Sequence, residues 1–118
     1  MNAIVKDRPA VPALKDPTLL RDKCWLDGKW ADADSGARFP VDNPADGSTL
    51  GTVPNMSTAE CKRAIDAANA ALPAWRALPA KERSKLLRKW FDLIVANADD
   101  LAAILTAEQG KPLAEAKG

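Results

Sequence analysis

The chain has 118 residues, of which 47% are hydrophobic and 28% are charged, and its formal net charge at pH 7 is +1. This composition is typical of a globular protein and not of a disordered segment. The near-neutral charge provides no general field that would attract nucleic acid or an anionic membrane, so we expect neither as a partner.

Residues 1–18 are interrupted by three prolines and are predicted to form a mobile N-terminal arm. Near its end, Asp16 precedes Pro17, which predicts a short helix that continues to Arg21, because proline is well tolerated at the first helical position. The ordered part of the chain is therefore expected to span residues 19–118.

A β-hairpin is predicted over residues 24–31. Asp27 and Gly28 lie between two runs that each contain a tryptophan. Both residues accept the positive φ that a two-residue hairpin turn requires, so this is a strong hairpin signal.

A second pair of strands is predicted over residues 37–42 and 49–53. Residues 44–47 contain proline and glycine and supply the turn between them. Pro40 indicates an edge strand or a strand end, because proline cannot donate to a neighbouring strand.

From Ser57 onward the apolar residues recur with a helical period. Ser57 and Glu60 are spaced as a capping box, in which each side chain bonds the free amide near the other. The following spacings of four, three and four predict one buried stripe, which comprises Cys61, Ile65, Ala68 and Leu72. Pro73 is expected to end this helix.

A second helix is predicted over residues 79–96. Its buried face is expected to contain Leu86, Leu87, Trp90, Phe91, Leu93 and Ile94. Its solvated face is expected to contain Lys81, Arg83, Lys85, Arg88 and Lys89. The basic residues alternate with apolar ones and include Glu82 among them, so we interpret them as a helix surface and not as a phosphate site.

A third helix is predicted to begin at Asn97, with two aspartates in its first turn, and to end at Gly110. Its apolar face comprises Leu101, Ile104 and Leu105. Glu108 continues that face, and is either a solvated residue at a fraying end or a buried partner, for example of a bound cation. Residues 112–117 predict the opening turns of a further helix.

Reactive side chains are few. The chain has no histidine, and Cys24 and Cys61 fit no metal or redox spacing. Nucleophiles that require histidine, and most zinc sites, are therefore excluded. Cys61 is interpreted as a small core residue and Cys24 as structural or incidental. No apolar run is long enough to cross a bilayer, and residues 1–20 contain no secretory signal, so a cytoplasmic location is expected.

Taken together, the motifs resemble the N-terminal part of the aldehyde dehydrogenase superfamily. They are WLDGKW at 25–30, FPVDNPADG at 39–47, residues 53–54, AIDAA at 64–68, AWR at 74–76 with ER at 82–83, and EQGKP at 108–112. Within the superfamily, the chain looks most similar to bacterial succinate-semialdehyde dehydrogenases, chiefly through residues 71–78 and 108–118.

This resemblance implies that the complete protein oxidises succinate semialdehyde to succinate with NAD or NADP, the last step of γ-aminobutyrate breakdown. In the family, a cysteine thiolate attacks the aldehyde, hydride passes to the nicotinamide, and a glutamate activates the water that hydrolyses the thioester. Neither cysteine of this chain matches the setting of that nucleophile, so no catalytic, cofactor-binding or metal residue is assigned. By itself the chain is expected to be inactive.

The resemblance also implies a fold class, mainly α with short β-hairpins, as the amino-terminal part of an α/β cofactor-binding domain. Residues 19–118 would be an incomplete portion of that domain, with the remainder of its own polypeptide as partner and a homo-oligomer as the assembly. Some members bind a monovalent cation near the positions of Val41 and Asp42, with an acidic side chain at the position of Glu108. The alternative is a stand-alone helical interaction module, which the abrupt end of the chain at a beginning helix disfavours.

Overall fold

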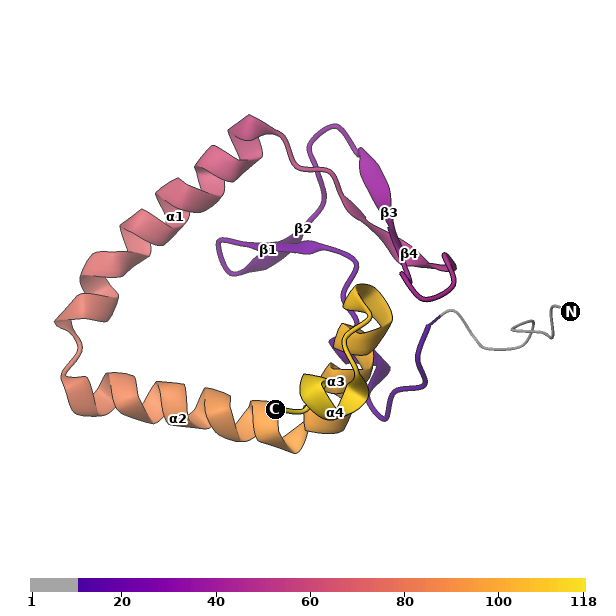
Figure 1. Cartoon of the computed structure of the whole chain (residues 1–118). Coiled ribbons are helices and arrows are strands. Elements are labelled where there is room, and N and C mark those ends of the chain that lie inside the picture. Colours follow the sequence, from indigo (N-terminus) through magenta and orange to yellow (C-terminus); the bar gives the residue numbers. More distant parts are fainter. Residues whose placement is uncertain (1–10) are drawn as a thin grey trace, which may run out of the picture.

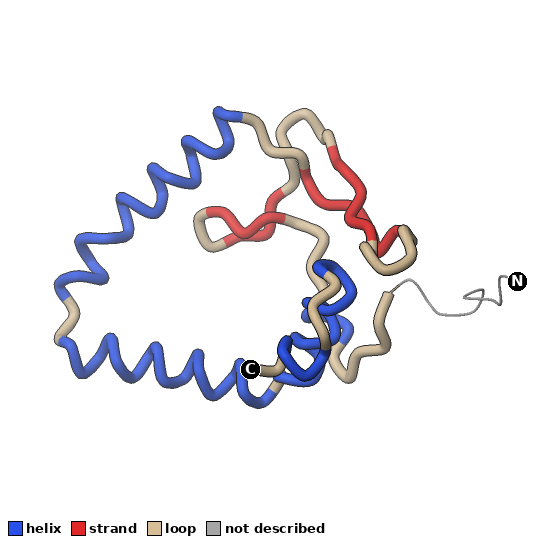
Figure 2. Tube along the Cα trace, in the orientation of Figure 1, coloured by secondary structure: helices blue, strands red, loops and turns tan. Residues whose placement is uncertain are grey.

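A computed structural model describes residues 11–118. Helices dominate it, and the strands are confined to two hairpins (Figure 2). In chain order the elements are η1 Pro17–Leu19, β1 Cys24–Leu26, β2 Lys29–Ala31, β3 Arg38–Asp42, β4 Thr49–Pro54, α1 Thr58–Ala77, α2 Ala80–Ala96, α3 Ala98–Gln109 and α4 Leu113–Ala116. The predicted class, mainly α with short β-hairpins, is confirmed.

The elements form an open, extended arrangement and not a compact globule. The long helices α1 and α2 meet at a corner, and α3 and α4 lie at the far end of α2 beside the hairpins (Figure 1). The Cα radius of gyration is 17.9 Å, against about 13 Å for a compact domain of about 100 residues. Most contacts between elements lie within the hairpins and among α2, α3 and α4.

Both hairpins form where the sequence predicts them. In the first, Trp25 lies opposite Trp30, and the turn residues Asp27 and Gly28 have φ of 50° and 75°. In the second, Pro40 lies in the middle of β3 opposite Thr52. Each sheet has two strands, so β3 is an edge strand, in which proline is tolerated.

The prediction that Pro73 ends the first helix is wrong. Helix α1 includes Pro73 and continues to Ala77. Proline removes one backbone donor, at a cost of about 3 kcal/mol in a helix interior. The neighbouring residues include Ala71, Leu72 and Ala74, which favour the helix strongly and let it resume after the missing bond.

The predicted buried faces of α1 and α2 are exposed, so this prediction is also wrong for the chain as described. Among residues 11–118 the buried apolar residues are Ala33, Leu50, Pro54 and Ala102. On α2, Trp90 is 63% exposed, and on α1, Ile65 is 68% exposed. Periodicity shows which side of a helix is apolar, but burial requires another element against it, and the described chain provides none.

Cys61 illustrates the same correction. It was predicted to be a core residue, yet its side chain is exposed on the uncovered stripe of α1. Cys24, in β1, is half-buried.

The ends of α3 agree with the sequence. Asn97 is the N-cap position, Asp99 and Asp100 occupy the first turn, and Gly110 closes the helix in the left-handed conformation. The Asn97 side chain does not cap α3, because it donates to the Leu93 carbonyl of α2. Residues 112–117 then form α4 with its flanking positions.

Replacing Gly110 by alanine is expected to destabilise the chain by about 1–2 kcal/mol. Its φ is 78°, a region in which a side chain costs about that much. A Cβ there would also lie 3.1 Å from Cγ of Pro44, in the turn between β3 and β4. Gly36→Ala is the matched control, because Gly36 has φ of 73° and open space around it. Urea denaturation of both variants separates the two effects, and equal losses would mean that the Pro44 contact contributes nothing.

Of the arm predicted over residues 1–18, residues 1–10 lie outside the described part. The rest is not free of the fold. The Asp100 carboxylate accepts hydrogen bonds from the backbone N–H groups of Lys15, at 3.0 Å, and Asp16, at 2.8 Å. Asp16 in turn caps η1 by accepting from the Thr18 amide.

Candidate functional site

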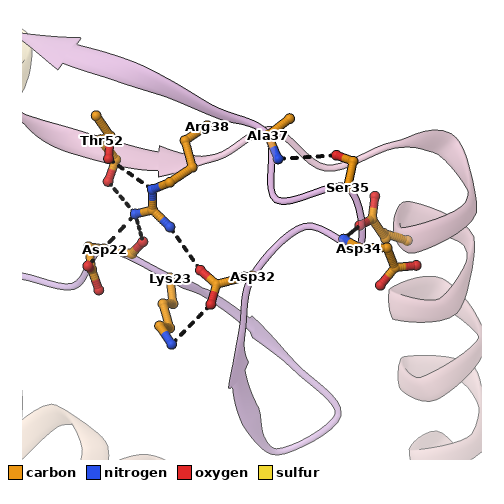
Figure 3. A network of polar contacts seen from close by, with 9 residues as sticks. Asp22, Lys23, Asp32, Asp34, Ser35, Ala37, Arg38 and Thr52 are labelled. Carbon is orange, nitrogen blue, oxygen red and sulfur yellow. Dashed lines mark hydrogen bonds and ion pairs between the residues drawn. The ribbon is translucent and has the colours of Figure 1, made fainter.

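Arg38 joins three separate segments of the chain (Figure 3). Its guanidinium donates to the carbonyl of Asp22 at 2.6 Å, to the carbonyl and Oγ1 of Thr52 at 2.8 and 2.9 Å, and to a carboxylate oxygen of Asp32 at 2.8 Å. Lys23 contacts the other oxygen of Asp32 at 3.1 Å. The hydrogen bond with Lys23, reinforced by the charge of Arg38, holds the pKa of Asp32 below its usual range.

A cavity of about 260 Å³ lies beside this network. One side is formed by Leu20, Arg21 and Asp22, which follow η1. The other sides come from the second hairpin and from α3, through Val41, Leu50, Gly51, Thr52, Val53 and Glu108. Two of the residues that Arg38 holds, Asp22 and Thr52, are therefore also cavity residues.

The structure brings together Val41 and Glu108, which the resemblance places near a cation. Both line the same cavity, although they are far apart in the sequence, whereas Asp42 does not line it. Of the two alternatives predicted for Glu108, a solvated residue or a buried partner, the structure shows the first, because this residue is exposed. Within residues 11–118 no group of three or more acidic, cysteine or histidine side chains is arranged to hold a metal ion. The cavity lining includes two acidic residues, Asp22 and Glu108, and carboxylate oxygens without cysteine or histidine suit an alkali cation better than a zinc ion.

A second polar junction holds the loop after the first hairpin against α1. The buried carboxylate of Glu60 accepts from the backbone N–H groups of Ser57 and Asp34, and the expected capping box is present. Arg63 adds a bidentate pair with the Asp34 carboxylate, at 2.8 and 2.9 Å. The hydrogen bond with the Ser57 side chain and those from the two backbone amides lower the pKa of Glu60.

Because the folded pKa of Glu60 is lowered, its stabilising contribution is complete above its ordinary pKa of 4.5 and is lost as the pH falls through the folded value. We expect the urea midpoint to decrease as the pH falls below the ordinary pKa of 4.5, and Glu60→Gln to remove part of that decrease. Glu115→Gln, at an exposed carboxylate of α4, is the control and should leave the profile unchanged. Identical profiles for the two variants would contradict this assignment.

The other candidate residues do not form a reactive site within residues 11–118. Cys24 and Cys61 have no histidine partner, since the chain has none. Of the basic residues of α2, Lys81, Lys85, Arg88 and Lys89 are exposed, and Lys85 pairs with Glu82 at 2.9 Å. Arg83, which was predicted to be solvated, is instead half-buried. No helix within residues 11–118 is long and apolar enough to span a bilayer.

Sequence reasoning missed the hydrogen bonds that Arg38 and Asp100 make to distant segments. The partners of Arg38 lie in separate loops and strands, and those of Asp100 are backbone groups about 85 positions away. No motif links such positions. Only the capping spacing of Glu60 was visible in the sequence, and its bond to Asp34 was not.

Residues 30–118 match the aldehyde dehydrogenase family. The chain belongs to this family. The motif resemblance is therefore confirmed, and the family explains why the hairpins and helices follow one another at this spacing.

The most similar relatives within this family include semialdehyde dehydrogenases. The chain is 61% identical over 105 residues to glutarate-semialdehyde dehydrogenase of Pseudomonas putida, and 56% identical over 105 residues to the NADP-dependent succinate-semialdehyde dehydrogenase of Escherichia coli. Each alignment covers 89% of this chain and 22% of the relative. The crystal structure of succinate-semialdehyde dehydrogenase from Burkholderia pseudomallei is 60% identical, with a TM-score of 0.87, over 91% of this chain and 22% of that one. The chain thus spans about a fifth of the length of these aldehyde dehydrogenases.

Proposed function

We propose that this chain forms the N-terminal part of an NAD(P)-dependent dehydrogenase that oxidises succinate semialdehyde to succinate. Identities of 56% with the succinate-semialdehyde dehydrogenase of E. coli and 60% with that of Burkholderia pseudomallei support this proposal. Glutarate semialdehyde, with one more carbon, is the second candidate substrate, because the glutarate-semialdehyde dehydrogenase of P. putida is 61% identical.

Within that enzyme the chain acts as scaffold. Residues 19–118 supply part of the NAD(P)-binding domain, and the exposed apolar faces of α1 and α2 pack against the rest of the polypeptide. This role accounts for helices whose apolar sides meet nothing in the described chain. It also accounts for the absence of an assigned catalytic or cofactor residue. The complete enzyme is proposed to be a cytoplasmic homo-oligomer.

A chimera tests this role. The chain replaces the matching 105 residues of the E. coli enzyme, and NAD(P)H formation is followed with succinate and with glutarate semialdehyde. We expect activity within about tenfold of the parent enzyme, since the exchange leaves the parent's catalytic residues in place. The 118-residue chain alone should form no NAD(P)H.

Two outcomes would overturn the proposal. Turnover by the chain alone would show that it contains its own catalytic site. A folded but inactive chimera would favour the alternative, a free-standing helical interaction module. The ratio of activities on the two semialdehydes is expected to follow the parent, because the scaffold contacts neither substrate.

We also propose a monovalent cation in the cavity, bound by Glu108 and by backbone carbonyls near Val41. Support comes from the position of both residues on one cavity. In the chimera, Glu108→Ala should weaken the response of activity to K⁺ or Na⁺, while Glu115→Ala should not. An unchanged salt response in the Glu108 variant would eliminate this site.

A further inference from the structure

We propose that residues 15–22 form a strap that closes one side of the cavity and is fastened at both ends. Asp100 holds the first end through the backbone N–H groups of residues 15 and 16. Arg38 holds the second end through the carbonyl of Asp22. This inference stands on the geometry of the described chain and does not depend on the proposed function.

The first fastening is a buried carboxylate. Asp100 is 6% exposed, and one oxygen accepts from Lys15 at 3.0 Å while the other accepts from Asp16 at 2.8 Å. Both carboxylate oxygens of Asp100 therefore accept hydrogen bonds from the strap. A hydrogen bond to a charged acceptor is among the stronger polar contacts in a protein.

The second fastening is the fork of Arg38. One of its nitrogens donates both to the Asp22 carbonyl, at 2.6 Å, and to the Thr52 carbonyl, at 2.8 Å. This nitrogen joins the end of the strap to β4, which forms the opposite side of the cavity. Figure 3 shows the guanidinium between these two segments.

Between its ends the strap is stiffened locally and covers the cavity. Asp16 accepts from both the amide and the hydroxyl of Thr18, at 3.0 and 2.6 Å, and η1 follows. Leu20, Arg21 and Asp22 then line the cavity. Releasing either end would expose the interior side of the cavity, which includes the buried Leu50.

Asp100→Asn in the 118-residue chain tests the first fastening. Asparagine keeps one acceptor oxygen but presents an N–H₂ group to the other backbone donor, so one bond is lost. Hydrogen exchange followed by mass spectrometry should show exchange at least about tenfold faster in the segment containing residues 15 and 16. Asp92→Asn is the matched control, because that exposed side chain pairs with Arg88 on the same helix, and exchange should stay within about twofold.

Hydroxyl-radical labelling of leucine side chains tests the closure itself. Labelling of Leu50 should increase in Asp100→Asn, and also in Arg38→Lys, which keeps the charge but cannot bond several acceptors at once. It should not change in Asp92→Asn.

Three outcomes would overturn the strap. The amides of residues 15 and 16 could be unprotected in the unsubstituted chain, which would mean that the fastening does not hold. Exchange in α3 could accelerate as much as in the strap, which would make Asp100 a helix stabiliser only. Leu50 labelling could stay constant, which would show that the strap does not close the cavity.

Discussion

The 118-residue chain, prepared alone, is expected to self-associate at micromolar concentration. Large apolar side chains on α2 are about half exposed, with Leu87 at 52%, Trp90 at 63% and Leu93 at 55%. Complete burial of such a side chain contributes about 1.5–3 kcal/mol, so covering the exposed half of each contributes about 1 kcal/mol. With so little buried apolar surface of its own, the chain gains more from a second copy than a compact domain would.

The double variant Leu87→Lys/Trp90→Lys should weaken this association at least roughly thirtyfold, because about 2 kcal/mol of burial is removed. Sedimentation velocity over a range of concentrations measures the effect. The control is Ser84→Lys/Asn69→Lys, which adds the same charge at exposed polar positions and should leave the association unchanged. A monomer with a single sharp melting transition would contradict the expectation, since it would require a self-contained core.

Local signals in the sequence predicted the elements well. These signals are the Asp27-Gly28 turn, the capping-box spacing of Ser57 and Glu60, and the helix-ending Gly110. Each determines the conformation of only a few neighbouring residues, so the turn or cap can be predicted from those residues alone. The same reasoning failed at Pro73, where the preferences of the flanking alanines outweighed a single missing donor.

Burial could not be predicted from this chain alone. The spacing of Ile65 and Leu72 on α1 identifies an apolar side correctly, but burial depends on the surface that covers it. Those side chains are 68% and 48% exposed here. The apolar pattern of α1 and the exposure of its apolar side chains are consistent if the surface that covers them belongs to the rest of the proposed enzyme.

The candidate site was predictable only through the family resemblance. Nothing in the spacing of Val41 and Glu108 indicates that they line one cavity, because one lies on a hairpin and the other on α3. No sequence feature indicated that Arg38 joins several segments, since an arginine in an exposed edge strand is ordinarily a solvated residue. Its partners become visible only when the loops around it are placed in space.

Arg38→Ala is expected to destabilise the chain by about 2 kcal/mol. The substitution removes hydrogen bonds to the carbonyls of Asp22 and Thr52, each of which contributes about 1 kcal/mol. The pair with Asp32 adds little, because that carboxylate is about half exposed and solvent screens the interaction. Urea denaturation gives the difference, with Arg76→Ala at an exposed position of α1 as the control.

Removing Arg38 should also loosen the segments around it more than it loosens the rest of the chain. Arg38 connects the end of the strap, the loop at Asp32 and β4, so its removal separates segments that share few apolar contacts. Exchange should accelerate most in residues 20–23 and 49–54, and least in α2, which Arg38 does not touch. Arg38→Lys should recover less than half of the loss, because an ammonium group cannot match the planar fork that reaches both carbonyls. Full recovery by lysine would mean that the charge, and not the geometry of the fork, stabilises this junction.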